Sequence, residues 1–337
     1  MKQAGTNAIP RWRGFNLMEM MGPKSKGDFS EDDFRWISDW GFDFVRIPMC
    51  YLLWIDGDWR HIREAELEKV DRVVGLGVKY RIHVDLNFHR APGYCVVLDP
   101  PEPFNLWKDK EAEDAFCFYW QTFARRYKGI DSRNLSFNLV NEPHSPDEMT
   151  MTRQDHERVI RRAVAAIRAV DPLRMIIADG LRQANDPCPE LADLGIAQSC
   201  RCYYPMGISH YQAEWTVKWM DPAKVPVPAW PGGWHEDGRL WARDDLERLY
   251  QPWIELAAKG VGVHCGEGGA YKNTPHAVFL RWFEDVLQIL KSGNIGWALW
   301  NFRGAFGVLD SMRKDVPYKD WHGHALDERL LKLLQTC

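Results

Sequence analysis

Several features that would place this chain in other classes of protein are missing from its sequence. No run approaches the ~18 consecutive apolar residues of a membrane-spanning helix, so no membrane association is expected. There is no Lys/Arg block that could follow a phosphate backbone, and the net charge of -4 is small, so nucleic acid is not an expected partner. The N-terminal stretch "MKQAGTNAIPRWRGF" lacks the apolar core of a secretory signal. We therefore expect a cytoplasmic protein, or a secreted one if a signal has been trimmed.

Metal and cofactor motifs are also missing. The 8 cysteines include no C-x-x-C pair, which favours reduced, individually buried thiols. Cys200 and Cys202 are expected to pack as thiols, and His322 and His324 to be surface or helix-start residues. No G-x-G-x-x-G follows the first expected strand, so no dinucleotide site is indicated. We expect neither a metal nor a cofactor.

Aromatic residues, in contrast, are abundant, with 17 Trp in 337 residues. Flat side chains that carry one polar N–H suit both core packing and stacking against sugar rings. Several of them fall in two long, Pro-rich connections, 89–110 and 204–240, and the second of these contains Trp215, Trp219, Trp230 and Trp234. Long loops in compact domains tend to be functional, so we expect at least one of these four to contact substrate.

Strand-like and helix-like segments alternate along the whole chain. Eight segments have strand character: 13–17, 42–48, 78–86, 135–141, 174–179, 196–204, 261–267 and 295–301. Helical periodicity lies between them, with Val159, Ala163, Ile167 and Val170 on one stripe, and a helix is expected after each strand, the last at 324–334. This order predicts an α/β fold, a single (β/α)8 TIM barrel forming one domain over 1–337, rather than a doubly wound open sheet.

Three helix starts are marked by capping signals. Ser30 with Asp33 and Thr152 with Asp155 have the spacing of a capping box. Thr274 followed by Pro275 is typical of an N-cap and first helical residue.

Polar or aromatic residues stand where these expected strands end, which is where barrels of this type carry their functional groups. They are Arg46, His89, Asn141, Glu142, Arg201, Tyr203, Glu267 and Trp300. Two carboxylates on different strands suit acid/base and nucleophile chemistry on an acetal, provided that one is protonated and the other charged. A neighbouring Arg and Tyr would help to keep the second carboxylate ionised.

Five segments together resemble glycoside hydrolase family 5, the cellulase-type retaining β-glycosidases. They are "FVRIP", "LNFHRAPG", "NLVNEP", "VGVHCGEGGAY" and "GWALWNFRGAFGVLDS", and the resemblance runs from Arg13 to about Leu334. It implies that Glu142 is the general acid/base, that Glu267 is the nucleophile and that Asn141 binds the 2-hydroxyl of the cleaved sugar. It also implies substrate-binding positions for Arg46, His89, Tyr203 next to the nucleophile, and Trp300 as a stacking platform.

Two positions depart from the family pattern. The sixth strand commonly carries His-x-Tyr, whereas "CRCYY" places Arg201 where that His would stand. Strand alternation puts Arg201 and Tyr203 on one face, so we expect Arg201 to point into the site and to alter which hydroxyls are favoured. Gly268 follows the expected nucleophile, where relatives often carry an aromatic residue, which leaves open how Glu267 is held.

Our leading hypothesis is a retaining hydrolase of β-1,4-linked glucans or gluco-oligosaccharides, with an oligosaccharide or polysaccharide as its partner. A β-mannan-directed enzyme is the alternative within the same chemistry, because glucose and mannose differ only at the 2-hydroxyl. A carbohydrate-binding barrel without activity would need neither glutamate. A metal-dependent amidohydrolase would need His-x-His on an early strand, which "RIHVDLNFH" does not provide. The oligomeric state is left open.

Overall fold

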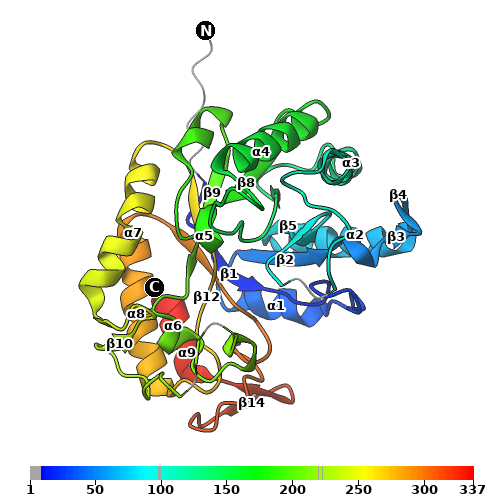
Figure 1. Cartoon of the computed structure of the whole chain (residues 1–337). Helices are drawn as coiled ribbons and strands as arrows, with labels where there is room; N and C mark the ends of the chain where they lie inside the picture. Colours follow the sequence, from blue (N-terminus) through cyan, green and yellow to red (C-terminus); the bar gives the residue numbers. More distant parts are fainter. Residues whose placement is uncertain (1–8, 98–99, 219, 222) are drawn as a thin grey trace.

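A computed structural model describes residues 9–97, 100–218, 220–221 and 223–337, and its centre is a closed barrel of eight parallel strands (Figure 1). The order around the barrel is β2-β1-β13-β12-β9-β8-β7-β5, and pairing of β5 with β2 closes the ring. The barrel strands are β1 (Arg13–Asn16), β2 (Phe44–Cys50), β5 (His83–Ala91), β7 (Leu135–Asn138), β8 (Met175–Asp179), β9 (Ala197–Cys202), β12 (Val263–Gly268) and β13 (Gly296–Leu299). The predicted (β/α)8 barrel is confirmed.

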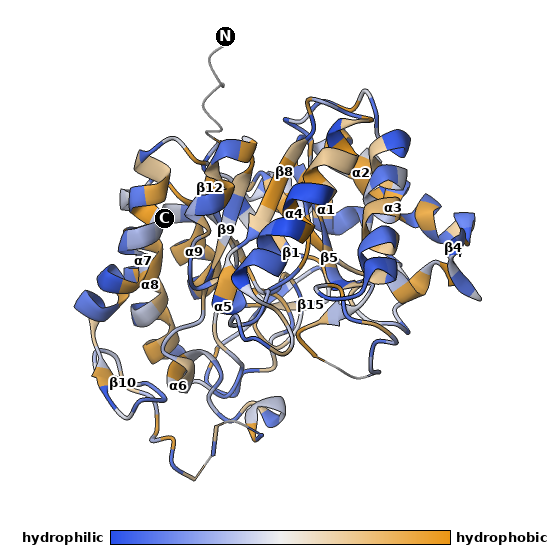
Figure 2. Ribbon diagram, turned by 45° about the horizontal axis from the view of Figure 1, so that its top comes forward, coloured by the Kyte–Doolittle hydropathy of each residue, from blue (hydrophilic) through white to orange (hydrophobic). Residues whose placement is uncertain are grey.

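Helices surround the barrel on the outside. The long ones are α1 (Glu31–Asp39), α2 (Glu64–Tyr80), α3 (Lys110–Arg126), α4 (Arg153–Arg168), α7 (Arg243–Ala258), α8 (His276–Ser292) and α9 (Glu328–Thr336). Figure 2 shows hydrophilic and hydrophobic residues mixed along outer helices such as α7, as expected of helices with one face on a core and one in solvent. Within the part of the chain that the structure describes, no helix is long and apolar enough to cross a membrane.

Local sequence explains where α4 begins and which face it buries. Thr152 Oγ1 accepts from the Asp155 backbone N–H over 3.1 Å, and Asp155 Oδ2 accepts from the Thr152 backbone N–H over 3.0 Å. This reciprocal pair is the predicted capping box, which satisfies two N–H groups that a helix start leaves free. Val159, Ala163 and Ile167 are buried on the inner face, while Val170 lies beyond the helix end and is only partly buried.

Two other capping predictions are wrong. Ser30 precedes α1, but its side chain makes no capping hydrogen bond. Thr274 is not the N-cap of α8: Pro275 takes that position, and the Thr274 hydroxyl donates to the Ile208 carbonyl over 2.5 Å. The error at Thr274 arises because a short hydroxyl side chain can bond another backbone group in place of the helix start.

The predicted strand at 78–86 is displaced. Residues 78–80 form the last turn of α2, Arg81 ends the helix in the left-handed region at φ 58°, and β5 runs from His83 to Ala91. The β-branched and aromatic residues of "VKY" favour a strand locally, but tertiary packing of the helix decides their structure.

Two of the eight expected helices also differ from the prediction. After β8 there are only α5 (Leu181–Ala184), with non-helical backbone inside it, and a 3-10 helix, η2 (Pro189–Leu194). The segment 324–334 begins as β15 (His324–Leu326), which pairs with β14 (Lys319–Trp321) before α9 starts.

The long connections carry short elements of their own. The connection after β2 holds η1 (Tyr51–Leu53), β3 (Ile55–Asp56) and β4 (Asp58–Ile62), and β6 (Tyr94–Cys95) folds back onto β5. The connection after β9 holds α6 (Met206–Ser209), η3 (Glu214–Thr216), β10 (Gly233–Trp234) and β11 (Leu240–Trp241). All eight cysteines are free and buried, as predicted.

Candidate active site

A continuous network of buried polar side chains lies at the carboxyl ends of the barrel strands. Six strands contribute one member each: Asn16, Asn138, Asp179, Arg201 and Glu267 are the last or next-to-last residue of their strands, and Arg46 lies within β2. Parallel strands place their carboxyl ends at one rim of the barrel, so residues distant in sequence meet there. Buried polar groups are costly unless they are paired, and these groups pair mainly with one another.

Glu267 is held by two hydrogen-bond donors and a second arginine. Its Oε1 accepts from Arg46 Nη1 over 2.5 Å and lies 3.3 Å from Arg201 Nη2, and its Oε2 accepts from the Tyr203 hydroxyl over 3.1 Å. Burial alone would raise the pKa of Glu267, but the charges of Arg201 and Arg46 outweigh burial and lower it. Glu267 is therefore kept as a carboxylate.

Glu142 lies just beyond β7 in a different environment. Its Oε1 accepts from Arg201 Nε over 2.9 Å, and its backbone N–H donates to Asp179 Oδ2 over 2.9 Å. Burial, and next the charge on Glu267, raise the pKa of Glu142 to about 7, against the opposing effect of Arg201. Glu142 is therefore protonated more readily than Glu267, and acid/base chemistry uses such a difference between two carboxyl groups.

Asn141 has one end of its amide bound and the other free. Its Oδ1 accepts from Arg46 Nη2 over 2.8 Å and from Arg201 Nη2 over 2.9 Å. Its buried Nδ2 has no hydrogen-bond partner among the described residues. The amide is thus oriented by two guanidinium groups, with a donor left for a ligand.

His89 and Trp300 form a stacked pair. Their rings stack with centroids 5.4 Å apart and planes 18° apart. Burial lowers the pKa of His89 to about 4, so its ring is neutral at neutral pH. Trp300 also packs, with Tyr203, against a small apolar cluster of Ala213, Tyr271 and Phe306. The eight residues singled out in the sequence thus come together at one rim.

Arg201 points into the site, but its donors are already used. Besides Glu142 and Asn141, it donates from Nη1 to Ser199 Oγ and to the Cys200 carbonyl, each over 3.1 Å, and from Nη2 to Asp179. Its side chain is 1% exposed. It therefore contacts protein groups where we expected it to select substrate hydroxyls.

Gly268, the second departure from the family pattern, is explained by packing. A Cβ at this position would lie 1.8 Å from Cys202 Sγ, so no larger residue fits while Cys202 stands opposite. Cys202 Sγ also donates to the Glu267 carbonyl over 3.4 Å. Glu267 is fixed by these contacts and by Arg46, Arg201 and Tyr203, without an aromatic residue at the position that follows it.

Asp179 is a member of the site that sequence reasoning missed. Besides Arg201 and the Glu142 backbone, its carboxylate accepts from Asn138 Nδ2 over 2.9 Å, and its side chain is fully buried. The available signal was the segment "RMIIAD", an apolar strand that ends in an acid at the same rim. Asn16 and Asn138 were missed as well; both accept from Arg46.

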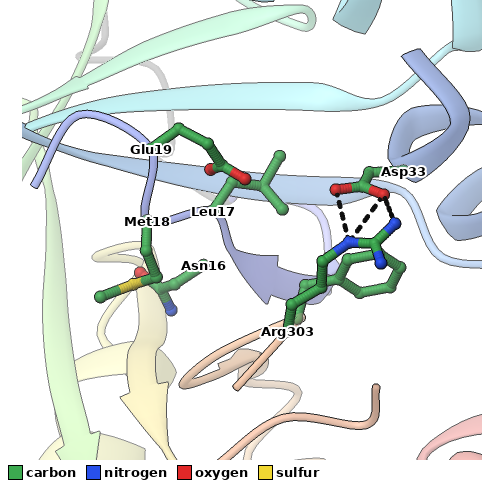
Figure 3. Close-up of a pocket in the computed structure, with 7 residues that line it drawn as sticks. Asn16, Leu17, Met18, Glu19, Asp33 and Arg303 are labelled. Carbon is green, nitrogen blue, oxygen red and sulfur yellow. Dashed lines mark hydrogen bonds and ion pairs between the residues drawn. The ribbon is translucent and has the colours of Figure 1, made fainter. Parts of the chain in front are cut away.

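A small pocket adjoins this network beside β1. Figure 3 shows Glu19, Asp33 and Arg303 around it, with Arg303 bonded to Asp33. Asn16 lines the pocket and connects it to Arg46, since its Oδ1 accepts from Arg46 Nη1 over 3.1 Å. Glu19 Oε2 is buried without a partner among the described residues, and burial raises the pKa of this carboxyl to about 7.

Among the described residues, no group of three or more His, Cys, Asp or Glu side chains is arranged to hold a metal ion. His322 stacks on Trp36, and His324, which lies on β15 and does not start a helix, pairs with Asp310 over 2.8 Å.

Comparison with known proteins identifies the family of the chain. The family model described as Cellulase (glycosyl hydrolase family 5) matches residues 1–305. A crystal structure of a glycoside hydrolase is 39% identical, with a TM-score of 0.90 over 97% of this chain and 99% of that one.

Two curated relatives are more distant. Cellodextrinase A of Ruminococcus flavefaciens is 27% identical over 79% of this chain and 76% of its own length. Endoglucanase C of Acetivibrio thermocellus is 28% identical over 85% of this chain and 88% of its own length.

The barrel and the matched family define the chain as a glycosidase. It belongs to glycosyl hydrolase family 5, the cellulase family, as its motifs indicated.

Proposed function

We propose that this glycosidase cleaves β-1,4-linked glucans or gluco-oligosaccharides with retention of anomeric configuration, using Glu142 and Glu267. The proposal rests on the difference in pKa between the two carboxyl groups that contact Arg201. Glu267 is held ionised by two arginines, whereas the pKa of Glu142 lies near 7. A nucleophile must be charged and a general acid protonated, so the chemistry assigns each residue one role.

In the first step, Glu142 gives its proton to the glycosidic oxygen while a Glu267 oxygen forms a bond to the anomeric carbon. The bond to the leaving sugar breaks, and that sugar departs with the proton. In the second step, Glu142 removes a proton from water, the water oxygen bonds the anomeric carbon, and the ester bond to Glu267 breaks. Two inversions at one carbon give overall retention.

The remaining residues bind and orient the sugar. The free Nδ2 of Asn141 supports a role as donor to the 2-hydroxyl of the ring under attack. The Trp300 indole, stacked on neutral His89, offers an apolar face to that ring. Tyr203 and Arg46 hold Glu267 in line with the anomeric carbon, since each donates to one of its oxygens.

The choice of glucan rests on the names of the relatives, a cellodextrinase and an endoglucanase, together with the free amide at the 2-hydroxyl position. The test is reducing-sugar release from cello-, manno-, xylo- and laminari-oligosaccharides, followed by proton NMR of the first product. Preference for cello-oligosaccharides with a β-product is expected. Preference for manno-oligosaccharides would establish the alternative substrate, and an α-product would overturn the mechanism.

A further inference from the structure

Among the residues that the structure describes, only Arg201 pairs with the side-chain carboxyl groups of both Glu142 and Glu267. Its Nε donates to Glu142 Oε1 over 2.9 Å, and its Nη2 lies 3.3 Å from Glu267 Oε1. Arg46, the other buried cation, contacts Glu267 and three asparagines but not Glu142. Among the described residues, Glu142 has no other charged hydrogen-bond donor.

The backbone around Arg201 is shaped to allow this double contact. The pairing of β9 with β12 shifts register between Cys265 and Glu267, so that Glu267 comes directly opposite Arg201. Such an irregularity re-aims a side chain without ending the strand. A Cβ at Gly266 would lie 3.0 Å from Arg201 Nη1, so the glycine leaves space for the guanidinium.

Asp179 fixes the guanidinium in this position. It accepts from Arg201 Nη2 and is itself held by Asn138 Nδ2 and by the Glu142 backbone N–H. With Glu142 protonated, the charges of Arg46 and Arg201 balance those of Asp179 and Glu267. A buried site with balanced charges avoids the large penalty of an unpaired ion.

That balance persists through the two-step reaction of the proposed function, on which this inference rests. When Glu267 becomes an ester it loses its charge, and when Glu142 gives up its proton it gains one. The negative charge therefore moves from one side of Arg201 to the other, and both ends of the move are within reach of the same cation.

We propose that Arg201, anchored by Asp179, is a positioning residue that stabilises the Glu267 carboxylate before sugar transfer and the Glu142 carboxylate after it. A histidine, the residue that the family resemblance places here, is smaller and has two nitrogens on one ring, so it cannot bridge two carboxyl groups and an aspartate together. Arg201 therefore lowers the proton affinity of both glutamates, and Asp179 opposes it.

Other charged and titratable groups also face Arg201 or the two glutamates. Tyr203 lies just after β9, Arg46 on β2 and His89 on β5 act on Glu267, and Asp85 on β5 interacts with both arginines. None of these four groups changes charge during the two-step reaction, whereas Glu142 and Glu267, the two carboxyl groups that Arg201 contacts, both do.

The test compares Arg201→Met and Asp179→Asn by their pH profiles of kcat/KM on an aryl β-cellobioside. Removing the cation should move both limbs of the profile to higher pH, by about one unit or more, because an opposite charge within contact lowers a carboxyl pKa by ~1–3 units. Removing the Asp179 charge should move the limbs to lower pH. Arg201→Lys, which keeps a charge, should restore the limbs toward their original positions.

A merely structural role predicts a different result, namely lower rates in both variants with unmoved limbs, and that outcome would overturn the inference. Circular dichroism checks the fold. If Arg201→Met does not fold, Asp179→Asn alone tests the inference. A shift of its pH profile to lower pH would support the inference, and an unmoved profile would overturn it. Retention is first measured on the unaltered enzyme, so loss of the proposed function is recognised separately from failure of this inference.

Discussion

The Tyr203 hydroxyl donates a hydrogen bond to Oε2 of Glu267 over 3.1 Å, on the side of the carboxylate opposite the two arginines. This bond favours the charged form of Glu267 and limits its rotation. It therefore helps to keep Glu267 charged and fixed in position without contacting the Glu142 carboxyl group.

Tyr203→Phe should lower kcat/KM by about tenfold or more and move the acidic limb of its pH profile to higher pH, because the pKa of Glu267 loses one stabilising donor. Steady-state kinetics between pH 4 and pH 9 would measure both effects. Tyr80→Phe is the matched control, since it removes a Tyr-to-Glu31 hydrogen bond of 2.7 Å on an outer helix. Equal behaviour of the two variants would contradict the assigned role.

Trp215→Ala should raise KM for long oligosaccharides more than for short ones. Trp215 is 50% exposed and lies edge-on to Tyr271 with ring centroids 4.9 Å apart, next to the Phe306 cluster that also supports Trp300. An exposed aromatic fixed in this way offers a face to a sugar beyond the cleaved bond. KM values for a cello-oligosaccharide series would test this.

Leu240→Ala, a similarly exposed apolar residue of the same connection, is the control for Trp215→Ala. Equal KM changes at all chain lengths would favour a packing role. Of the other tryptophans in this connection, Trp230 is buried and donates to Asp285 over 2.8 Å, so it is a packing residue. Trp219 lies outside the described residues.

Gly268→Ala should destabilise the protein by about 1–3 kcal/mol, because its Cβ would meet Cys202 Sγ. Cys202→Ala removes that sulfur, so the double variant should recover part of the loss. Urea unfolding of the two single variants and the double variant gives the coupling free energy. Additive losses would contradict a direct clash.

Glu19→Gln should stabilise the protein at pH 8 more than at pH 5. The pKa of Glu19 is about 7 in the folded state, above its ordinary value, so the folded state binds more protons and its stability falls as pH rises between the two values. Removing the charge should gain about 1–3 kcal/mol in the free energy of unfolding at pH 8 and little at pH 5. Asp320→Asn, at an exposed position, is the control; a gain at both pH values would refute the account.

The sequence allowed prediction of the barrel because its strands are short apolar segments separated by helical periodicity. It failed where tertiary contacts override a local preference, as at 78–80, which extends α2, and after β8, where no full helix forms. Glu142 and Glu267 were found because each ends an apolar segment within a recognisable motif.

Asp179 has the same strand-end position but no motif, so its role emerges only from its bonds to Arg201 and Glu142. The bridging of two carboxyl groups by Arg201 could not be predicted either, because it depends on the shift in register between β9 and β12. Spacing along the chain does not encode which residues meet across two strands.

The central claim, that Glu142 is the acid/base and Glu267 the nucleophile, is tested most directly by azide rescue of the two alanine variants on an aryl β-cellobioside with a good leaving group. Glu142→Ala should still form the glycosyl-enzyme, since such a group departs without protonation, and azide should then release the β-glycosyl azide. Glu267→Ala cannot form that intermediate, so azide entering the vacated space should give the α-azide. The α-azide from Glu142→Ala would reverse the assignment, and undiminished hydrolysis in either variant would contradict it.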